Sequence, residues 1–356
     1  LVRLHAAGYP PAIEAGALSI MASFSSWNGE KITGDKYLLT DVLKDRMGFD
    51  GFIVGDWNAH GQVDGCTNED CPEALNAGLD MYMAPDSWRG LYESTLEHVK
   101  SGEIPMERLD DAVRRILRAK LHFGIFEEGP PASRALAGKT ELLGTPKHRA
   151  VARQAVRESL VLLKNDGVLP IRPEARILVT GDGADSITKQ AGGWTLTWQG
   201  GGAANEEFPN ADSILDGLKE AGSAVEYSED GSFTETPDVA VIVFGENPYA
   251  EFRGDVKHLA YDIGGTREIE LLKQYHEQGI PVVSVFLSGR PMWVNPELNA
   301  SDAFVAAWLP GSEGGGIADL LIGDADGAPR YDFKGKLSYS WPKAPDQTPL
   351  NVGDAD

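Results

Sequence analysis

The chain has 356 residues, of which 42% are hydrophobic and 24% charged, and its formal net charge at pH 7 is −22. This length is enough for roughly two domains with sizeable cores. The acidic balance disfavours nucleic acid and anionic membrane surfaces as partners, and no apolar run reaches the ~18 residues of a membrane span. We therefore expect a globular protein that acts on a neutral partner or works in an extracellular or salt-rich setting.

The ends and the cysteines indicate where such a chain works. It begins at Leu1 rather than Met and stops at Asp356 without an evident closing element, so we expect a piece truncated at both ends. Cys66 and Cys71 stand in a polar loop, either as a disulfide, which would indicate an oxidising compartment, or as free thiols. We expect a secreted or periplasmic protein. Two cysteines alone make a poor metal site and the histidines show no ligand spacing, so we expect no metal or cofactor.

The first 127 residues alternate short apolar runs with amphipathic segments. The runs predict strands over 17–24, 51–56 and 79–83, and the amphipathic segments predict helices over 35–47, 71–76, 88–101 and 106–123. This alternation is typical of parallel βαβ units. Three such units are about half of a closed (β/α)8 barrel, which needs about 250 residues. The region is therefore half a barrel or a small open sheet.

A second domain follows an expected linker over 128–150, where Gly and Pro are frequent and apolar periodicity is lost. We place the domains at 1–127 and 151–356. Beyond a helix over 145–160, the second domain is predicted to contain strands over 176–180, 239–244, 282–287 and 303–308 and helices over 213–221, 266–278 and 316–322. These elements predict a three-layer α/β/α sandwich.

Residues 51–57 form the most informative segment, with the sequence GFIVGDW. The apolar run predicts a buried parallel strand that ends at Asp56 and Trp57, and ligands of α/β folds bind at that end of a strand. A carboxylate beside an indole suits a sugar site. The alternative is an aspartate that caps the next helix beside a core tryptophan.

Three glycine-containing loops of the second domain carry further candidates. The segment GGWTLTWQG over 192–200 presents Trp194 and Trp198, of which we expect one to bind ligand and one to be structural. The segment over 245–255 carries Glu246 and Glu251 after a predicted strand. The glycines of 181–185 lack the third glycine of a dinucleotide fingerprint, so we favour a βα turn over a nucleotide site. Two carboxylates that flank a sugar are what glycoside hydrolysis requires, and the aromatic side chains beside each acid offer stacking surfaces for the sugar.

These motifs, in this order, resemble glycoside hydrolase family 3, in particular its two-domain β-glucosidases and β-glucan exohydrolases. The likeness extends from 19–29 (SIMASFSSWNG), through the segments just described, to 306–314 (AAWLPGSEG). It implies the C-terminal half of a (β/α)8 barrel followed by an α/β sandwich, with the active site in the cleft between them. It also implies a retaining, exo-acting enzyme that removes β-linked glucose from glucosides or β-glucans.

The same resemblance implies roles for individual residues. Asp56 is the expected nucleophile, and Glu251 is the expected acid/base, with Glu246 as the alternative. Trp57 and Trp198 match the aromatic pair that clamps the leaving sugar. Met21 and Met83 match positions lining the site of the non-reducing sugar.

Two residues depart from the family pattern near the expected substrate site, and they bear on which glycan the site prefers. Phe24 replaces a tyrosine and Gln62 an arginine of related exohydrolases, and each change removes a polar contact near the substrate. The earlier strands that grip the sugar hydroxyls are absent from this sequence, so we expect the chain alone to be inactive or very weak. A β-N-acetylhexosaminidase of the same family and a non-catalytic carbohydrate-binding derivative are the alternative functions.

Overall fold

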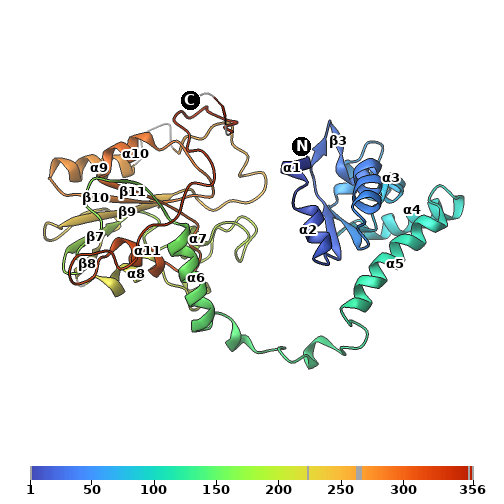
Figure 1. Ribbon diagram of the computed structural model, residues 1–356, viewed down its shortest axis with the longest axis horizontal. Helices are drawn as coiled ribbons and strands as arrows, with labels where there is room; N and C mark the ends of the chain where they lie inside the picture. Colours follow the sequence, from blue (N-terminus) through green and yellow to red (C-terminus); the bar gives the residue numbers. More distant parts are fainter. Residues whose placement is uncertain (1, 223, 262–266, 352, 355–356) are drawn as a thin grey trace. The chain divides into compact units, whose positions relative to one another are not determined.

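The computed structural model describes residues 2–222, 224–261, 267–351 and 353–354. The chain divides into two compact units, Leu1–Lys139 and Thr140–Asp356, so the division falls within the expected linker (Figure 1). Thr266, the first residue of one predicted helix, lies outside the described residues, as do Leu1 and Asp356 at the ends. Within the described ranges, no helix is long and apolar enough to cross a membrane.

Unit 1 is built around a parallel sheet with the strand order β1-β4-β5. In chain order its helices and strands are α1 (Val2–His5), α2 (Tyr9–Glu14), β1 (Ser19–Ala22), β2 (Ser26–Trp27), β3 (Glu30–Lys31), the 3₁₀ helix η1 (Ile32–Gly34), the π-helix η2 (Tyr37–Arg46), β4 (Phe52–Trp57), the 3₁₀ helix η3 (Ala59–Gln62), α3 (Pro72–Ala77), β5 (Met81–Met83), α4 (Trp88–Ser101), α5 (Met106–His122) and the 3₁₀ helix η4 (Pro131–Ser133).

The core of unit 1 fixes the central strand β4. Ile53 of β4 is fully buried with Leu79, which precedes β5, and with Phe49, which precedes β4. Because β4 hydrogen-bonds to a parallel strand on each side, its C-terminal end is held in register with β1 and β5. The parallel βαβ units predicted from the sequence are confirmed.

Unit 2 is a six-stranded sheet with the order β6-β11-β10-β9-β7-β8, in which only β6 runs antiparallel to its neighbour. Its helices and strands among the described residues are the 3₁₀ helix η5 (Thr140–Leu142), α6 (Pro146–Ser159), β6 (Val161–Asn165), β7 (Arg176–Thr180), α7 (Ile187–Ala191), the 3₁₀ helix η6 (Asn205–Glu207), α8 (Ile214–Ala221), β8 (Ala224–Tyr227), β9 (Val239–Gly245), α9 (Arg267–Glu277), β10 (Val282–Leu287), α10 (Asn295–Ala300), β11 (Ala303–Trp308) and α11 (Gly315–Leu321).

Helices cover both faces of the unit 2 sheet (Figure 1). Helices α6, α8 and α11 pack on one face, and α9 and α10 pack on the other. Every residue of β9 and β10 is buried, which explains their continuous apolar sequences, because a parallel sheet covered on both faces has no polar side. The predicted α/β/α sandwich is confirmed.

Candidate active site

Asp56 lies at the C-terminal end of β4, as the sequence predicted. Its Oδ1 accepts a hydrogen bond from the backbone N–H of Trp57 at 2.7 Å. Asn58 then turns the chain with a left-handed φ of 53°, and its N–H donates to the Met83 carbonyl at 2.9 Å. This turn follows the end of the strand at Trp57, so the Asp56 carboxylate lies at the C-terminal end of the sheet and does not cap the following 3₁₀ helix η3, whose N-cap residue is Asn58.

Unit 1 brings its other predicted residues to the same end of the sheet. Trp57 is 58% exposed and pairs in register with Met83 of β5. Met21 of β1 is 47% exposed and pairs with Val54, two residues before Asp56. Large apolar side chains that remain exposed beside a carboxylate provide surfaces on which the C–H face of a sugar can pack.

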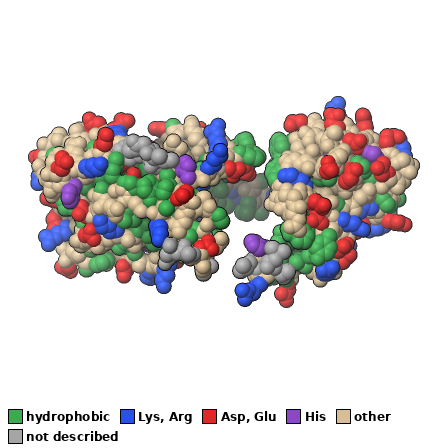
Figure 2. All heavy atoms as spheres, turned by 90° about the horizontal axis from the view of Figure 1, so that it is seen from above, with side chains coloured by type: hydrophobic (Ala, Val, Ile, Leu, Met, Phe, Trp, Pro, Cys, Tyr) green, Lys and Arg blue, Asp and Glu red, His purple; other side chains and the backbone are tan. Residues whose placement is uncertain are grey.

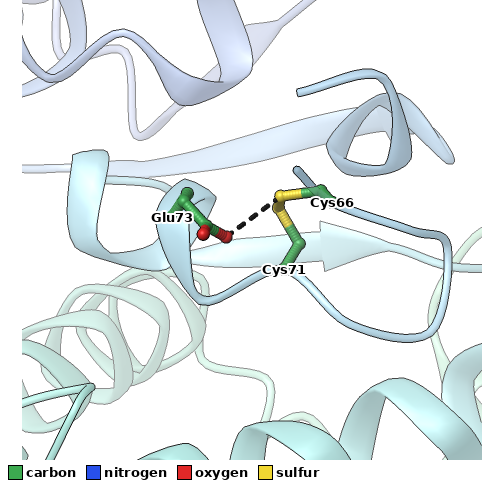
Figure 3. A group of neighbouring side chains, drawn as sticks. All are labelled: Cys66, Cys71 and Glu73. Atoms are coloured by element: carbon green, nitrogen blue, oxygen red, sulfur yellow. Dashed lines mark hydrogen bonds between the residues drawn. A yellow bond between two sulfur atoms is a disulfide. The ribbon is translucent and has the colours of Figure 1, made fainter. Parts of the chain in front are cut away.

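The loop after β4 is closed by a disulfide between Cys66 and Cys71 (Figure 3). Of the two alternatives that the sequence left open, the structure has the disulfide. Glu73 Oε2 lies 3.1 Å from Cys66 Sγ, so the three side chains form a compact group. Because both sulfurs are in the disulfide, they offer no thiolate ligands to a metal.

Glu251 lies in the loop after β9, and two tryptophans of another loop hold its carboxyl group. Trp194 Nε1 donates to Oε1 at 3.3 Å, and Trp198 Nε1 donates to Oε2. Trp198 also meets the ring of Phe252 edge to face, with ring centroids 6.2 Å apart. Unit 2 therefore brings together the predicted residues Glu251 and Trp198, and it adds Trp194, which the sequence did not assign to the acid.

The Gln199 side chain joins the tryptophan loop to the backbone of the Glu251 loop. Gln199 Oε1 accepts from the Ala250 N–H at 2.9 Å, and Gln199 Nε2 donates to the Glu251 carbonyl at 3.4 Å. A Cβ on Gly193 would lie 2.0 Å from the Tyr249 carbonyl oxygen, so only glycine permits the close approach of the two loops there. No sequence pattern marked Gln199, because its partners stand about fifty residues further along the chain.

Glu246 has different surroundings, because the Arg290 guanidinium hydrogen-bonds to one of its carboxylate oxygens. Arg290 donates to its Oε1 from Nε at 3.0 Å and from Nη2 at 2.7 Å, and Tyr249 OH donates to Oε2 at 3.3 Å. Burial, followed by the charge of Glu246, raises the pKa of Tyr249, so the phenol stays a donor. Glu246 is thus an acceptor in a partly buried ion pair.

The glycines of 181–185 lie in the turn between β7 and α7, in agreement with the βα-turn interpretation. A Cβ on Gly181 would lie 2.2 Å from the Val243 carbonyl oxygen. A five-residue helix, α7, does follow, which the sequence did not predict. Its Lys189 donates to Asp182 at 2.5 Å and to the Gly245 carbonyl at 3.0 Å, so the ammonium joins two strand ends.

Both parts of the chain match domains of known proteins. Residues 1–119 match the Glycosyl hydrolase family 3 N terminal domain, and residues 160–355 match the Glycosyl hydrolase family 3 C-terminal domain. The chain belongs to glycoside hydrolase family 3. The family resemblance predicted from the sequence motifs is confirmed, and unit 1 is accordingly a partial family 3 barrel domain.

Family 3 relatives align along nearly the whole chain. A lysosomal beta glucosidase of Dictyostelium discoideum is 35% identical over 92% of this chain and 42% of its own length. A periplasmic beta-glucosidase of Salmonella typhimurium is 31% identical over 96% of this chain and 48% of its own length. The crystal structure of a Q683A mutant of an exo-1,3/1,4-beta-glucanase from a Pseudoalteromonas species has 53% identity and a TM-score of 0.96, over 99% of this chain and 58% of that one. The chain thus spans about half the length of the curated relatives.

Proposed function

We propose that this chain supplies both catalytic carboxylates of a retaining, exo-acting glycoside hydrolase that removes β-linked glucose from the non-reducing ends of β-glucosides or β-glucans. Membership in family 3 supports the reaction class. The substrate class is supported by the similar Pseudoalteromonas protein, which is described as an exo-1,3/1,4-beta-glucanase. The net charge of −22 is compatible with a neutral sugar as substrate.

The observation that carries the proposal is the placement of Glu251 between two indole N–H donors. Each carboxyl oxygen accepts one indole N–H, which fixes the plane of the group. Since a carboxyl oxygen has two lone-pair sites, each keeps one for a proton or a substrate atom. An oriented carboxyl group among exposed aromatic rings suits proton transfer to a sugar oxygen.

In the proposed mechanism, Asp56 attacks the anomeric carbon while Glu251 gives its proton to the departing glycosidic oxygen. The C–O bond to the leaving group breaks, and a glycosyl ester forms on Asp56. Glu251, now ionised, takes a proton from water, whose oxygen attacks the same carbon and releases Asp56. Two inversions give net retention of configuration.

We propose that Trp57 and Trp198 form platforms for the sugar on the leaving-group side, and that Met21 and Met83 pack against the glucose ring. The exposure of Trp57 and Trp198, at 58% and 47%, leaves their rings accessible. Glu246 is a poorer candidate, because Arg290 donates twice to its Oε1 and Tyr249 OH donates to its Oε2, so its carboxylate is engaged in an ion pair within unit 2.

We further infer that the protein works in an oxidising, extracytoplasmic compartment. The disulfide between Cys66 and Cys71 supports this, since such bonds persist where thiols are not kept reduced. The description of one relative as periplasmic and another as lysosomal agrees with it.

The test is the leaving-group dependence of Glu251 variants in the full-length protein. Glu251→Ala should slow hydrolysis of alkyl β-glucosides about 10²–10⁴-fold, spare formation of the glycosyl ester from 2,4-dinitrophenyl β-glucoside, and be rescued by azide with a β-glucosyl azide product. Glu246→Ala is the matched control and should show no azide rescue. Rescue of the Glu246 variant instead would move the acid/base role to that residue.

A further inference from the structure

Arg290 lies in the loop after β10 and has donors directed at both ends of the loop that carries Glu251. Its Nε and Nη2 donate to Glu246, which follows β9 directly. Its Nη1 donates to the Gly254 carbonyl oxygen at 2.6 Å. One guanidinium therefore contacts the chain five residues before Glu251 and three residues after it.

The same guanidinium stacks on the middle of the loop. Arg290 Cζ lies 4.5 Å from the ring centroid of Tyr249, two residues before Glu251. The Tyr249 hydroxyl donates to Glu246 Oε2, the oxygen that Arg290 leaves open. A stacked cation and a shared carboxylate thus hold the tyrosine ring on two sides.

Tyr249 has little freedom to move away from this position. A Cβ added to Gly254 would lie 2.9 Å from its Cδ2, and one added to Gly289 would lie 2.8 Å from its hydroxyl oxygen. Gly193 lies directly against its carbonyl oxygen. Because glycine backbone packs directly around Tyr249, a shift of its ring or of Arg290 would displace the backbone that leads to Glu251.

We propose that Arg290 is a positioning residue that sets the place of the Glu251 carboxyl group; this rests on the proposed role of Glu251 as acid/base. A general acid must reach the leaving oxygen at hydrogen-bond distance, and displacement by about 1 Å can cost about 10²-fold in rate. Lysine cannot replace the arginine, because a single ammonium lacks the planar fork that reaches Glu246 and Gly254 at once and has no flat face for the ring.

The experiment compares Arg290→Lys with Glu251→Gln in the full-length protein, using aryl β-glucosides whose leaving groups span a wide range of pKa. Arg290→Lys should lower kcat/KM for the poorest leaving groups about 10²-fold and leave 2,4-dinitrophenyl β-glucoside within about threefold. Arg176→Lys is the matched control. It makes the same change at an exposed ion pair at the start of β7, and it should leave every substrate unaffected.

The two possible failures are separable. If Glu251→Gln itself slows all substrates equally, the proposed function of Glu251 is wrong. If Glu251→Gln is selective for poor leaving groups but Arg290→Lys slows all of them equally or none, the positioning role is wrong. Tyr249→Phe keeps the stacked ring and removes only the hydroxyl, so it serves as a second variant if Arg290→Lys fails to fold. It should lower kcat/KM selectively for substrates with poor leaving groups, by a smaller factor than Arg290→Lys. An equal loss for all substrates would count against the proposal.

Discussion

Asp80 holds together the end of the unit 1 sheet opposite to Asp56. Its side chain is fully buried and accepts from Lys44 Nζ at 2.8 Å, from the Ile53 N–H at 2.8 Å and from Arg108. Burial lowers the pKa of the Lys44 ammonium despite its hydrogen bond with Asp80, so removal of the Asp80 charge would leave a buried cation without its partner. Asp80 thereby fixes the start of β4 and β5.

Asp80→Asn should therefore destabilise unit 1 by about 3–5 kcal/mol, the usual cost of leaving a buried charge without its partner. Asp110→Asn, which affects only an exposed helical pair with Arg114, should cost less than about 1 kcal/mol. Urea unfolding with hydrogen exchange of β4 measures both. Equal effects of the two substitutions would contradict the structural role of Asp80.

Gly193 offers a second test at the level of single residues. Gly193→Ala places a methyl group against the Tyr249 carbonyl oxygen and should separate the tryptophan loop from the Glu251 loop. We expect a change in tryptophan emission and a loss of about tenfold in the rate for β-glucosides with poor leaving groups. Gly201→Ala adds the same group in the same loop with no atom within 4 Å and should have no effect. Identical spectra for both variants would refute the contact.

The sequence marks the catalytic candidates but not the residues that hold them in place. Asp56 and Glu251 could be chosen because each follows a buried strand and belongs to a family motif. Gln199 and Arg290 could not, since their partners lie far away in the sequence and a polar residue in a loop has no distinguishing pattern. The one available signal for Arg290 was its place after the apolar run of β10.

At the scale of elements, long apolar runs were predictable and short or half-buried segments were not. Strands β7 and β10 occur as predicted, and β9 is one residue longer, because their buried sequences allow little else. The four-residue edge strand β8 is only partly buried, and α7 and α10 are too short for helical periodicity to show. The helix expected over 35–47 is present as the π-helix η2, whose different hydrogen-bond spacing leaves the apolar pattern nearly unchanged.

His98 of α4 contacts Asp70 in the loop that the disulfide closes, and this contact should make the stability of unit 1 depend on pH. The imidazole contacts Asp70 and Glu103 at 2.6 Å each, and the hydrogen bond with Asp70, followed by that with Glu103, raises the pKa of His98. A raised folded-state pKa means that the stabilisation is full below the unfolded value of about 6.5 and is lost as the pH rises through the higher folded value.

The difference in Tm between the wild type and His98→Gln should accordingly be largest near pH 5 and shrink toward pH 9. His122→Gln, at the exposed end of α5, is the control and should change Tm little. Thermal unfolding followed by circular dichroism across this range measures both. A constant difference for His98→Gln would show that the bridge does not depend on the charge of the imidazole.

At the scale of the whole molecule, the net charge of −22 and the membership in family 3 are compatible with the neutral carbohydrate substrate that we propose. Acidic side chains are spread over the face seen in Figure 2, with Lys and Arg interspersed among them. The fold class and the family followed from the sequence, because many motifs in a fixed order are far more specific than any one of them, whereas the order of the strands in each sheet was not predicted.

The central claim is that Asp56 is the nucleophile of a retaining β-glucosidase reaction. The direct measurement is peptide mapping by mass spectrometry after the full-length protein reacts with 2,4-dinitrophenyl 2-deoxy-2-fluoro-β-glucoside, which forms a long-lived glycosyl ester. The label should be found on Asp56, and Asp56→Asn should not be labelled. A label on another residue, or unchanged labelling of the Asp56→Asn protein, would contradict the account.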